Sequence, residues 1–369
     1  MDISIFVPVY KQSDQLEGML DALCVQNVDK EIFVTIDAPT EDFSCKIKSI
    51  QRNNVNFIVN HERVGKANAL NSTVGLSSGK VLLFLDADVG IPNDPDYLRK
   101  IVMEMEHVDV LDIKKKVTKD KSFLSKMAYY EYLTFNISAW IASRFMHKCP
   151  AVNGAAFAIR REMFEKVGGF RKVVAEDIDI ATRAFLKDSR FAYSHDVEVK
   201  NVVHGDWKLW LTQRRRWSIG QALWLKDWFR HLVGRFIKKP QVFLPGLFFL
   251  YPSVAVFFLS AVVPSLWMYN SLLVVSLFMS VKFNIALPIF LVSLATADIL
   301  KVLVISLSGF AVTAAVFYGF SRKLGFNEMK LHELFVYYFF YSSIWMMIIV
   351  IGHIQVLALG KKAGPDWKT

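Results

Sequence analysis

The first hundred residues alternate short apolar runs with stretches of helical periodicity. The apolar runs are rich in β-branched residues, as the strands of a buried sheet are. They span Ile3–Val9, Ile32–Asp37, Val55–Val59 and Val81–Asp86. Between them, Asp14–Val25 and Lys66–Leu76 repeat apolar residues at helical spacing. This alternation predicts an α/β fold in which helices cover both faces of a mostly parallel sheet.

Long apolar runs replace this alternation in the last third of the chain. No Asp, Glu, Lys, Arg or His occurs from Val242 to Val281, and one bilayer crossing needs about 20 apolar residues. We therefore predict a folded domain at 1–205, amphipathic interface helices at 206–240, about four transmembrane helices within 241–360 and a short basic tail at 361–369. The expected crossings lie near 243–267, 271–296, 299–320 and 333–358.

The orientation in the membrane follows from the basic residues and from the N-terminus. Four crossings return the basic tail to the side of the first domain, but they place Arg322, Lys323 and Lys330 in an outer loop, which basic loops tend to avoid. Three crossings with one apolar segment lying in the interface reverse both placements, so both arrangements stay open. The N-terminus lacks a basic region before a long apolar core, which predicts a first strand and a cytoplasmic domain.

The overall composition agrees with a membrane protein. Hydrophobic residues make up 53% of the 369 residues, which is more than ordinary soluble proteins contain. The formal charge of +10 suits an anionic membrane surface or a phosphate-bearing ligand. We find no nucleic-acid-binding motif, so we expect no nucleic-acid partner. The densest basic run, Lys114–Lys121, is predicted to be a solvated loop rather than a lipid-binding patch.

Polar groups stand at the carboxyl ends of three predicted strands, where ligands bind in sheets of this kind. They are Tyr10, Asp37 and the triplet Asp86-Ala87-Asp88. Two carboxylates at this spacing suit a sugar nucleotide, because one can hold Mg²⁺ or Mn²⁺ while the other reaches the nucleoside side. The metal would neutralise the charge of the departing diphosphate. We assign the metal to Asp88.

Two acids open a helix that is predicted to run from Glu176 to about Lys187. Acids in a first turn often interact only with the helix dipole. A transferase that inverts the anomeric centre, however, needs a carboxylate that accepts the proton of the incoming hydroxyl. Asp177 is our candidate for this catalytic base. Glu176 would orient Asp177 or the acceptor, and Asp179 would cap the helix.

A helical register starting at Trp207 places a row of tryptophans on one face. The row comprises Trp207, Trp210, Trp217, Trp224 and Trp228. Its basic neighbours predict that most of these residues lie in the headgroup region of a bilayer. Trp217 is the exception, because an indole can stack on a sugar ring and the arginines before it can hold a diphosphate.

These motifs and their order resemble the membrane-embedded family 2 inverting glycosyltransferases with the GT-A fold, a group that includes the hyaluronan, chitin and cellulose synthases. The matching motifs are Val7-Pro8-Val9-Tyr10, Asp37, Arg63-Val64-Gly65-Lys66-Ala67-Asn68-Ala69-Leu70-Asn71, Asp86-Ala87-Asp88, Asn153-Gly154-Ala155-Ala156, Val167-Gly168-Gly169-Phe170, Glu176-Asp177 and Gln213-Arg214-Arg215-Arg216-Trp217. The resemblance implies a GT-A nucleotide-diphospho-sugar transferase domain, with a mixed and mostly parallel sheet, before the interface helices and the transmembrane region.

The resemblance also implies roles for individual residues. Asp37 would bind the base of the donor, beside Tyr10 and Lys66, and Gln213, Arg216 and Trp217 would close over the diphosphate and the acceptor. The full set of implied donor-binding residues is Pro8, Val9, Tyr10, Asp37, Arg63, Lys66, Asp86, Ala87, Asp88, Gln213 and Arg216. The implied acceptor-binding residues are Asn153, Gly154, Glu176 and Trp217. Lys11 and Ala38 depart from the family pattern beside the nucleoside pocket, where the family usually has Asn and Gly.

We therefore expect a metal-dependent inverting glycosyltransferase in the plasma membrane. Its donor would be a nucleotide sugar, with a UDP-sugar favoured over a GDP-sugar, and its acceptor a lipid-linked or growing saccharide at the cytoplasmic face. A processive polysaccharide synthase stays open as an alternative. A channel or transporter with a nucleotide-sensing domain is a second alternative, which the scarcity of ionisable residues in the apolar segments disfavours. A scaffold without activity is disfavoured by the presence of Asp88, Asp177 and Trp217 together.

Overall fold

A computed structural model describes residues 1–238 apart from 53, 119–120 and 204, together with residues 240, 262, 265–283 and 286–361. The chain divides into two compact units, described separately below: Met1–Pro245 with Met347–Thr369, and Gly246–Met346. Most of the crossing predicted at 243–267 lies outside the described residues, as does nearly all of the basic tail.

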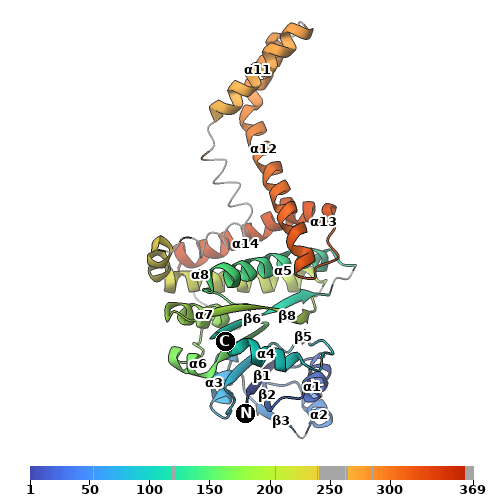
Figure 1. The fold of residues 1–369 in the computed structure, drawn as a ribbon, viewed down its shortest axis with the longest axis vertical. Coiled ribbons are helices and arrows are strands. Elements are labelled where there is room, and N and C mark those ends of the chain that lie inside the picture. Colours follow the sequence, from blue (N-terminus) through green and yellow to red (C-terminus); the bar gives the residue numbers. More distant parts are fainter. Residues whose placement is uncertain are drawn as a thin grey trace. The chain divides into compact units, whose positions relative to one another are not determined.

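The first unit is built on a mixed sheet of eight strands in the order β3-β2-β1-β4-β7-β6-β8-β5 (Figure 1). The strands are β1 (Ile3–Tyr10), β2 (Lys30–Asp37), β3 (Val55–Asn60), β4 (Val81–Leu85), β5 (Val89–Gly90), β6 (Val110–Val117), β7 (Ala156–Arg160) and β8 (Phe191–Asn201). The four strands predicted from the sequence, β1 to β4, are parallel to one another. The antiparallel strand β7 joins them to the second half of the sheet, where β6 and β8 are again parallel.

Helices of the first unit cover this sheet. They are α1 (Leu16–Cys24), α2 (Glu41–Ile50), α3 (Lys66–Val74), α4 (Tyr97–Met105), α5 (Phe123–Ile141) with the π-helical turn η1 (Ala142–Met146), α6 (Arg161–Val167), α7 (Glu176–Leu186) and α8 (Trp207–Lys238). The helices predicted at 14–25 and 66–76 correspond to α1 and α3, and the helix predicted from Glu176 corresponds to α7.

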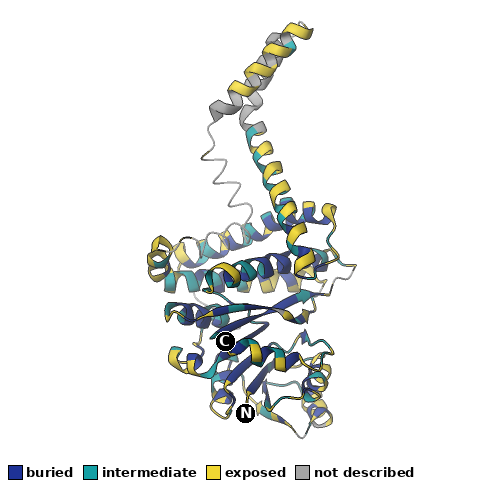
Figure 2. Ribbon diagram, viewed as in Figure 1, coloured by how far each residue is buried: buried dark blue, intermediate teal, exposed yellow. Residues whose placement is uncertain are grey.

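The core of this unit lies on both faces of the sheet. On one face Phe84 of β4 stacks on Phe6 of β1 at 5.1 Å and on Phe157 of β7 at 5.2 Å between ring centroids. The edge of Phe170 meets Phe84 at 4.9 Å. Aliphatic residues of the same strands pack on the other face against α1 and α4. Buried residues therefore follow the strands (Figure 2), and this rigid core holds the strand ends that carry the polar residues.

The basic run Lys114–Lys121 begins inside the sheet. Lys114 and Lys116 of β6 form ion pairs with Glu198 of β8 at 2.9 and 2.8 Å. Lys115 is only 2% exposed and is paired with Asp112. The prediction of a solvated loop is therefore wrong for Lys114–Lys116, because these lysines belong to β6 and carboxylates of β6 and β8 neutralise them within the sheet.

The second unit contains α11 (Ser265–Phe283), α12 (Ala286–Lys323), α13 (Leu331–Val336), the π-helical turn η3 (Tyr337–Tyr341) and the start of α14 (Ser342–His353). The expected break between the crossings at 271–296 and 299–320 is wrong, because α12 is continuous from 286 to 323. No glycine or proline occurs from 289 to 308, so nothing in this stretch interrupts the backbone hydrogen bonds.

The described part of the chain contains two helices that are long and apolar enough to cross a membrane, Lys301–Lys323 and Leu331–Ala358, each with a mean hydropathy of 2.0. Only 6% of the first is buried, and its exposed residues include Val302, Leu303 and Val312. Such a surface suits lipid better than water. These helices are candidate membrane spans.

The end of the second apolar helix belongs to the first unit and packs on α8. Val356 of the π-helical turn η4 (Ile354–Ala358) contacts Ile219 and Ala222 of α8. Ser218 of α8 donates a hydrogen bond to the carbonyl of Ile348 at 2.8 Å. A Cβ on Gly352 would lie 1.8 Å from the Ser218 Oγ, so glycine is needed for this close helix packing.

Candidate active site

The carboxyl ends of β1, β2 and β4 bring the predicted polar residues to one edge of the sheet. Tyr10, the last residue of β1, is in register with Asp37, the last residue of β2. Asp86 follows β4 directly, and its backbone N–H donates to the carbonyl of Ala155 at 3.0 Å. The prediction that these strand ends lie at one edge of the sheet is therefore confirmed. The first residues of α3 and α7 complete the site at this edge.

Lys66 connects two of the predicted acids. As the first residue of α3, it places its Nζ 2.8 Å from the Oδ1 of Asp86 and 2.9 Å from the Oε1 of Glu176. Burial alone would lower the pKa of Lys66, but the carboxylates of Asp86 and Glu176 outweigh it and the pKa is raised. Lys66 is therefore a permanent cation at this edge. A small pocket brings the same groups together with Pro8, Gly154 and Asp177.

Asp177 is half-buried and lies beside this cation. Its Oδ2 accepts the N–H of Gly154 at 2.8 Å, and its Oδ1 accepts its neighbour's N–H, that of Ile178, at 2.8 Å. Burial, reinforced by the charge of Glu176, raises the pKa of Asp177 to about 6, against the opposing effects of Lys66 and the two N–H groups. A carboxylate with a pKa near neutrality is well matched to accepting a proton from a hydroxyl.

The predicted acceptor loop is held against this carboxylate. A Cβ on Gly154 would lie 2.6 Å from the Oδ2 of Asp177, so only glycine allows this approach. The side chain of Asn153 accepts the N–H of Ala155 at 3.0 Å and closes the turn. Below the loop, Asp112 accepts the backbone N–H of Asn153. The loop is thus shaped by its own backbone contacts and by the buried pair of Asp112 with Lys115.

On the nucleoside side, Asp37 organises the loop before α3. Its two carboxylate oxygens accept the N–H groups of Val64 and Gly65, each at 2.9 Å, and the residue is buried. The guanidinium carbon of Arg63, from this loop, lies 4.5 Å from the centroid of the Tyr10 ring. Tyr10 is nevertheless about half exposed at the end of β1. Base binding by Asp37 remains a prediction.

The other predicted donor-binding residues near the strand ends differ in exposure. Val9 belongs to the hydrophobic core, so only its backbone is offered to a donor. The carbonyl of Ala87 accepts a hydrogen bond from the Ser13 hydroxyl at 2.5 Å.

Lys11 and Ala38 have positive φ angles of 65° and 49°, where asparagine and glycine are less strained. Both departures from the family pattern therefore fall at backbone positions that ordinary residues rarely occupy.

Asp88, the predicted metal ligand, is exposed. It lies two residues after Asp86, which pairs with Lys66. Within the described residues, no three His, Cys, Asp or Glu side chains gather as a complete metal site. A cation held by Asp88 would therefore take its remaining ligands from diphosphate oxygens and water. Mg²⁺ and Mn²⁺ favour all-oxygen sets of this kind, so the donor set fits either ion.

The motif Gln213-Arg214-Arg215-Arg216-Trp217 lies on α8, and its second residue is the buried one. Arg214 is 2% exposed and pairs with Glu131 of α5 at 2.5 Å, also buried. Its guanidinium lies 4.3 Å from the Trp217 ring and 5.6 Å from the Trp210 ring. Gln213 and Arg216 are exposed. Sequence reasoning named Arg214 in the motif but missed its pairing with Glu131, because no pattern links residues 83 positions apart.

Breaking this buried ion pair should destabilise the protein. We expect Arg214→Met to lower the free energy of unfolding by about 3–5 kcal/mol, because Glu131 would remain as an uncompensated buried charge. Thermal unfolding of the purified protein in detergent would measure the change. Arg215→Met is the matched control, since Arg215 is exposed and should matter little. Equal effects of the two substitutions would contradict the structural importance of the pair.

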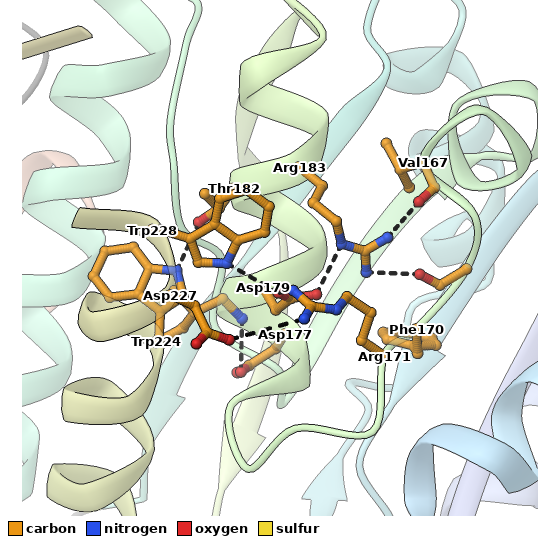
Figure 3. Close-up of polar contacts among 12 residues, drawn as sticks. Val167, Phe170, Arg171, Asp177, Asp179, Thr182, Arg183, Trp224, Asp227 and Trp228 are labelled. Carbon is orange, nitrogen blue, oxygen red and sulfur yellow. Dashed lines mark hydrogen bonds and ion pairs between the residues drawn. The ribbon is translucent and has the colours of Figure 1, made fainter. Parts of the chain in front are cut away.

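Two of the tryptophans predicted to anchor the chain in lipid contact protein instead. The indole N–H of Trp224 donates to the Thr182 hydroxyl at 2.9 Å, and that of Trp228 donates to the Asp179 carboxylate at 3.0 Å (Figure 3). The anchor prediction is therefore wrong for Trp224 and Trp228, because their face of α8 meets α7. The predicted capping role of Asp179 is also wrong, since its carboxylate accepts from the side chains of Arg171, Arg183 and Trp228 and α7 has no side-chain cap hydrogen bond.

The groups around Lys66, here called the Lys66 cluster, combine both predicted catalytic residues with three of the eleven predicted donor-binding residues and with one further predicted acceptor-binding residue. Pro8, Lys66, Asp86, Gly154, Glu176 and Asp177 line one small pocket. Among the described contacts, none joins Gln213, Arg216 or Trp217 directly to this cluster. A further link was missed: Asn71 of α3 exchanges two hydrogen bonds with the backbone of Phe170, at 2.8 and 2.9 Å. Asn71 and Phe170 each end one of the motifs quoted in the sequence analysis, so the sequence marked both residues but not the contact between them.

The comparisons with known proteins agree with this geometry. The family described as Glycosyl transferase family group 2 matches residues 81–359. The chain belongs to this family. The family 2 enzyme is 27% identical over 296 residues to a probable glycosyltransferase, YdaM, of Bacillus subtilis (strain 168), covering 78% of this chain and 64% of that protein. It is 26% identical over 241 residues to a probable glucomannan 4-beta-mannosyltransferase 3 of Arabidopsis thaliana, covering 61% and 43%.

The GT-A fold is confirmed by a solved structure. The mannosyltransferase PcManGT from Pyrobaculum calidifontis, in complex with GDP-Man and Mn²⁺, superposes with a TM-score of 0.51 at 20% identity, covering 82% of this chain and 86% of that one. The family 2 enzyme spans less than two thirds of the length of the two curated relatives. The family match and the fold of this neighbour agree with each other.

Proposed function

We propose that this glycosyltransferase moves a sugar from a nucleotide-diphosphate donor to a saccharide or lipid-linked acceptor, with inversion at the anomeric carbon. The observation that carries the proposal is the half-buried carboxylate of Asp177, which has its pKa raised to about 6 and shares a small pocket with the permanent cation Lys66. In the proposed reaction an acceptor hydroxyl oxygen bonds to the anomeric carbon while the bond from that carbon to the diphosphate breaks. Asp177 accepts the hydroxyl proton.

The donor side supports this reaction through charge. Lys66 stays protonated at neutral pH and offers a fixed positive charge near Asp86. We propose that Asp88 holds Mg²⁺ or Mn²⁺, which would supply charge neutralisation for the diphosphate. Tyr10, Arg63 and the loop organised by Asp37 would hold the nucleoside. Fixed charges of this kind stabilise a departing anion without reorganisation during the reaction.

The acceptor would approach from the side of α8. We propose that the Asn153-Gly154 turn and Glu176 line its opening, with Trp217 as the stacking surface and Gln213 and Arg216 closing over the diphosphate. The candidate membrane spans support an acceptor held at a bilayer. We retain the predicted division into a cytoplasmic catalytic domain (1–205), interface helices (206–240), transmembrane helices (241–360) and a basic tail (361–369), in the plasma membrane.

The identity of the donor has two candidates. A UDP-sugar is the prediction from the sequence. A GDP-sugar is the second candidate, because relatives are named as mannosyltransferases and one structural neighbour holds GDP-Man. Repeated addition to a growing polysaccharide is the corresponding alternative to a single addition, since the Arabidopsis thaliana relative is named a glucomannan 4-beta-mannosyltransferase.

A donor panel tests the proposal. Purified protein in lipid vesicles with Mn²⁺ would receive radiolabelled UDP-glucose, UDP-N-acetylglucosamine or GDP-mannose, together with a polyprenyl-linked sugar or a β-linked manno-oligosaccharide. We expect one donor to label a product, and to do so only with divalent metal. The size of the product separates single from repeated addition. Absence of both transfer and donor hydrolysis with every donor would overturn the proposed function.

A further inference from the structure

One face of α8 packs against α7 and the loop that precedes α7, and it forms hydrogen bonds with α7. Trp217, Gly220, Trp224 and Trp228 recur at three- and four-residue spacing, so they share a face of the helix. A Cβ on Gly220 would lie 3.2 Å from the Val174 side chain. Val174 is two residues before Glu176, where α7 begins. The helix that carries the proposed acceptor platform therefore touches the backbone that leads into the proposed base.

Asp179 is the centre of this joint (Figure 3). Its carboxylate is buried and accepts from Trp228 of α8 at 3.0 Å, from Arg171 of the preceding loop at 3.1 Å and from Arg183 of α7 at 2.8 Å. Arg171 also lies 3.8 Å from the Asp227 carboxylate of α8. Three elements thus meet at a single carboxylate, which lies two residues after Asp177 on the same helix.

The same network continues to the donor side. Arg183 donates to the carbonyls of Val167 at 2.5 Å and Gly169 at 2.7 Å. Gly169 packs against Asn71 of α3, since a Cβ there would lie 2.7 Å from its Oδ1. Lys66 begins the same helix. Base, cation and acceptor helix are therefore connected by side chains that the reaction does not itself use.

We propose that Asp179, Trp228, Trp224 and Thr182 are positioning residues that set the register of α8 on α7, and thereby the distance between Trp217 and Asp177. The inference rests on the proposed function, because it takes Trp217 as the acceptor platform and Asp177 as the base. Apolar contacts alone would hold the two helices together but would allow them to slide. Hydrogen bonds from two indoles are directional, so they select one register.

Removing a single donor atom tests this role. Trp228→Phe keeps an aromatic ring and loses the N–H that Asp179 accepts. With the nucleotide sugar identified by the donor panel, we would measure transfer to the oligosaccharide and hydrolysis by water in the same assay. Hydrolysis needs the base and the donor but no acceptor platform. We expect transfer to fall about tenfold or more while hydrolysis and donor KM stay within about twofold, because a small displacement of the acceptor is costly.

Matched variants make the result specific. Trp207→Phe makes the same chemical change on the same helix, at an exposed tryptophan that stacks on Phe123, and should leave the ratio of transfer to hydrolysis unchanged. Thr182→Val removes the acceptor of the Trp224 N–H and should lower the ratio as Trp228→Phe does. It also serves as the test if Trp228→Phe does not fold.

The outcomes are distinct. A lower ratio in Trp228→Phe and Thr182→Val, with thermal unfolding within a few degrees of the unmodified protein, supports the positioning role. An unchanged ratio overturns it, and so does a parallel loss of transfer, hydrolysis and stability, which marks the joint as structural only. Failure of the unmodified protein to transfer or hydrolyse any donor would instead overturn the proposed function.

Discussion

Asp177→Asn should abolish most sugar transfer while leaving the donor bound. An amide cannot accept the hydroxyl proton, and loss of a general base costs about 10²–10⁴-fold in rate. The amide still offers one oxygen, so one of the two N–H groups from Gly154 and Ile178 keeps its acceptor. Because the substitution also removes a charge from a half-buried position, we expect melting to change little. Steady-state transfer and calorimetric binding of the nucleotide diphosphate would be measured together.

The matched control for Asp177→Asn is Asp42→Asn. Asp42 is also the second residue of its helix, α2, but it is exposed. Its substitution should leave transfer within about twofold, as expected for an exposed residue away from the site. An equal loss of donor binding and transfer in Asp177→Asn would show that Asp177 holds the nucleotide or the fold rather than the proton.

The pH dependence of transfer follows from the same carboxylate. The pKa of Asp177 is raised to about 6, and the base is active only when ionised. Transfer should therefore be constant well above pH 6 and fall about tenfold per pH unit well below it. The folded protein binds this proton more tightly than the unfolded chain, whose Asp has a pKa of about 3.9. The contribution of Asp177 to stability is thus fully present below about pH 4 and is lost as pH rises through about 6.

The first half of the sheet could be predicted because its signals are local. Each of β1 to β4 is a short apolar run, and parallel strands bring their ends to one edge, so Tyr10, Asp37 and Asp86 could be placed together in advance. The position of Asp177 at the start of α7 was equally readable. The second half of the sheet was not predicted, since β6 carries the charged residues Asp112 and Lys114–Lys116 and does not read as a buried strand.

The parts of the site that sequence reasoning missed depend on contacts between distant residues. Lys66 and Glu176 are 110 positions apart, and nothing local indicates that one ammonium joins Asp86 to Glu176. Trp224 and Trp228 of α8 were predicted to lie in lipid headgroups but contact α7 instead. An amphipathic face rich in Trp and Arg reads the same whether lipid headgroups or a second helix covers it. Only the Thr182 and Asp179 contacts distinguish the two.

Asp88→Asn should remove the metal dependence of nucleotide diphosphate binding as well as most activity. The i, i+2 spacing of Asp86 and Asp88 beyond β4 leads us to assign the metal to Asp88, which is exposed at the end of the site. A carboxylate-to-amide change removes the charge that Mg²⁺ or Mn²⁺ requires. We expect transfer to fall by about 10²-fold or more, comparable to the loss of another electrostatic group that stabilises a developing charge.

The decisive measurement for Asp88→Asn does not need turnover. Calorimetric titration of UDP and GDP, each with and without Mn²⁺, should show tighter binding with Mn²⁺ for the unmodified protein and for the Asp42→Asn control. In Asp88→Asn the two titrations should give the same affinity, and melting should be unchanged because the side chain is exposed. If Mn²⁺ still tightened binding in this variant, the cation would have to be held by other residues and Asp88 would lose its assignment. Retained Mn²⁺ dependence together with lost transfer would move Asp88 from the metal to the sugar or ribose of the donor.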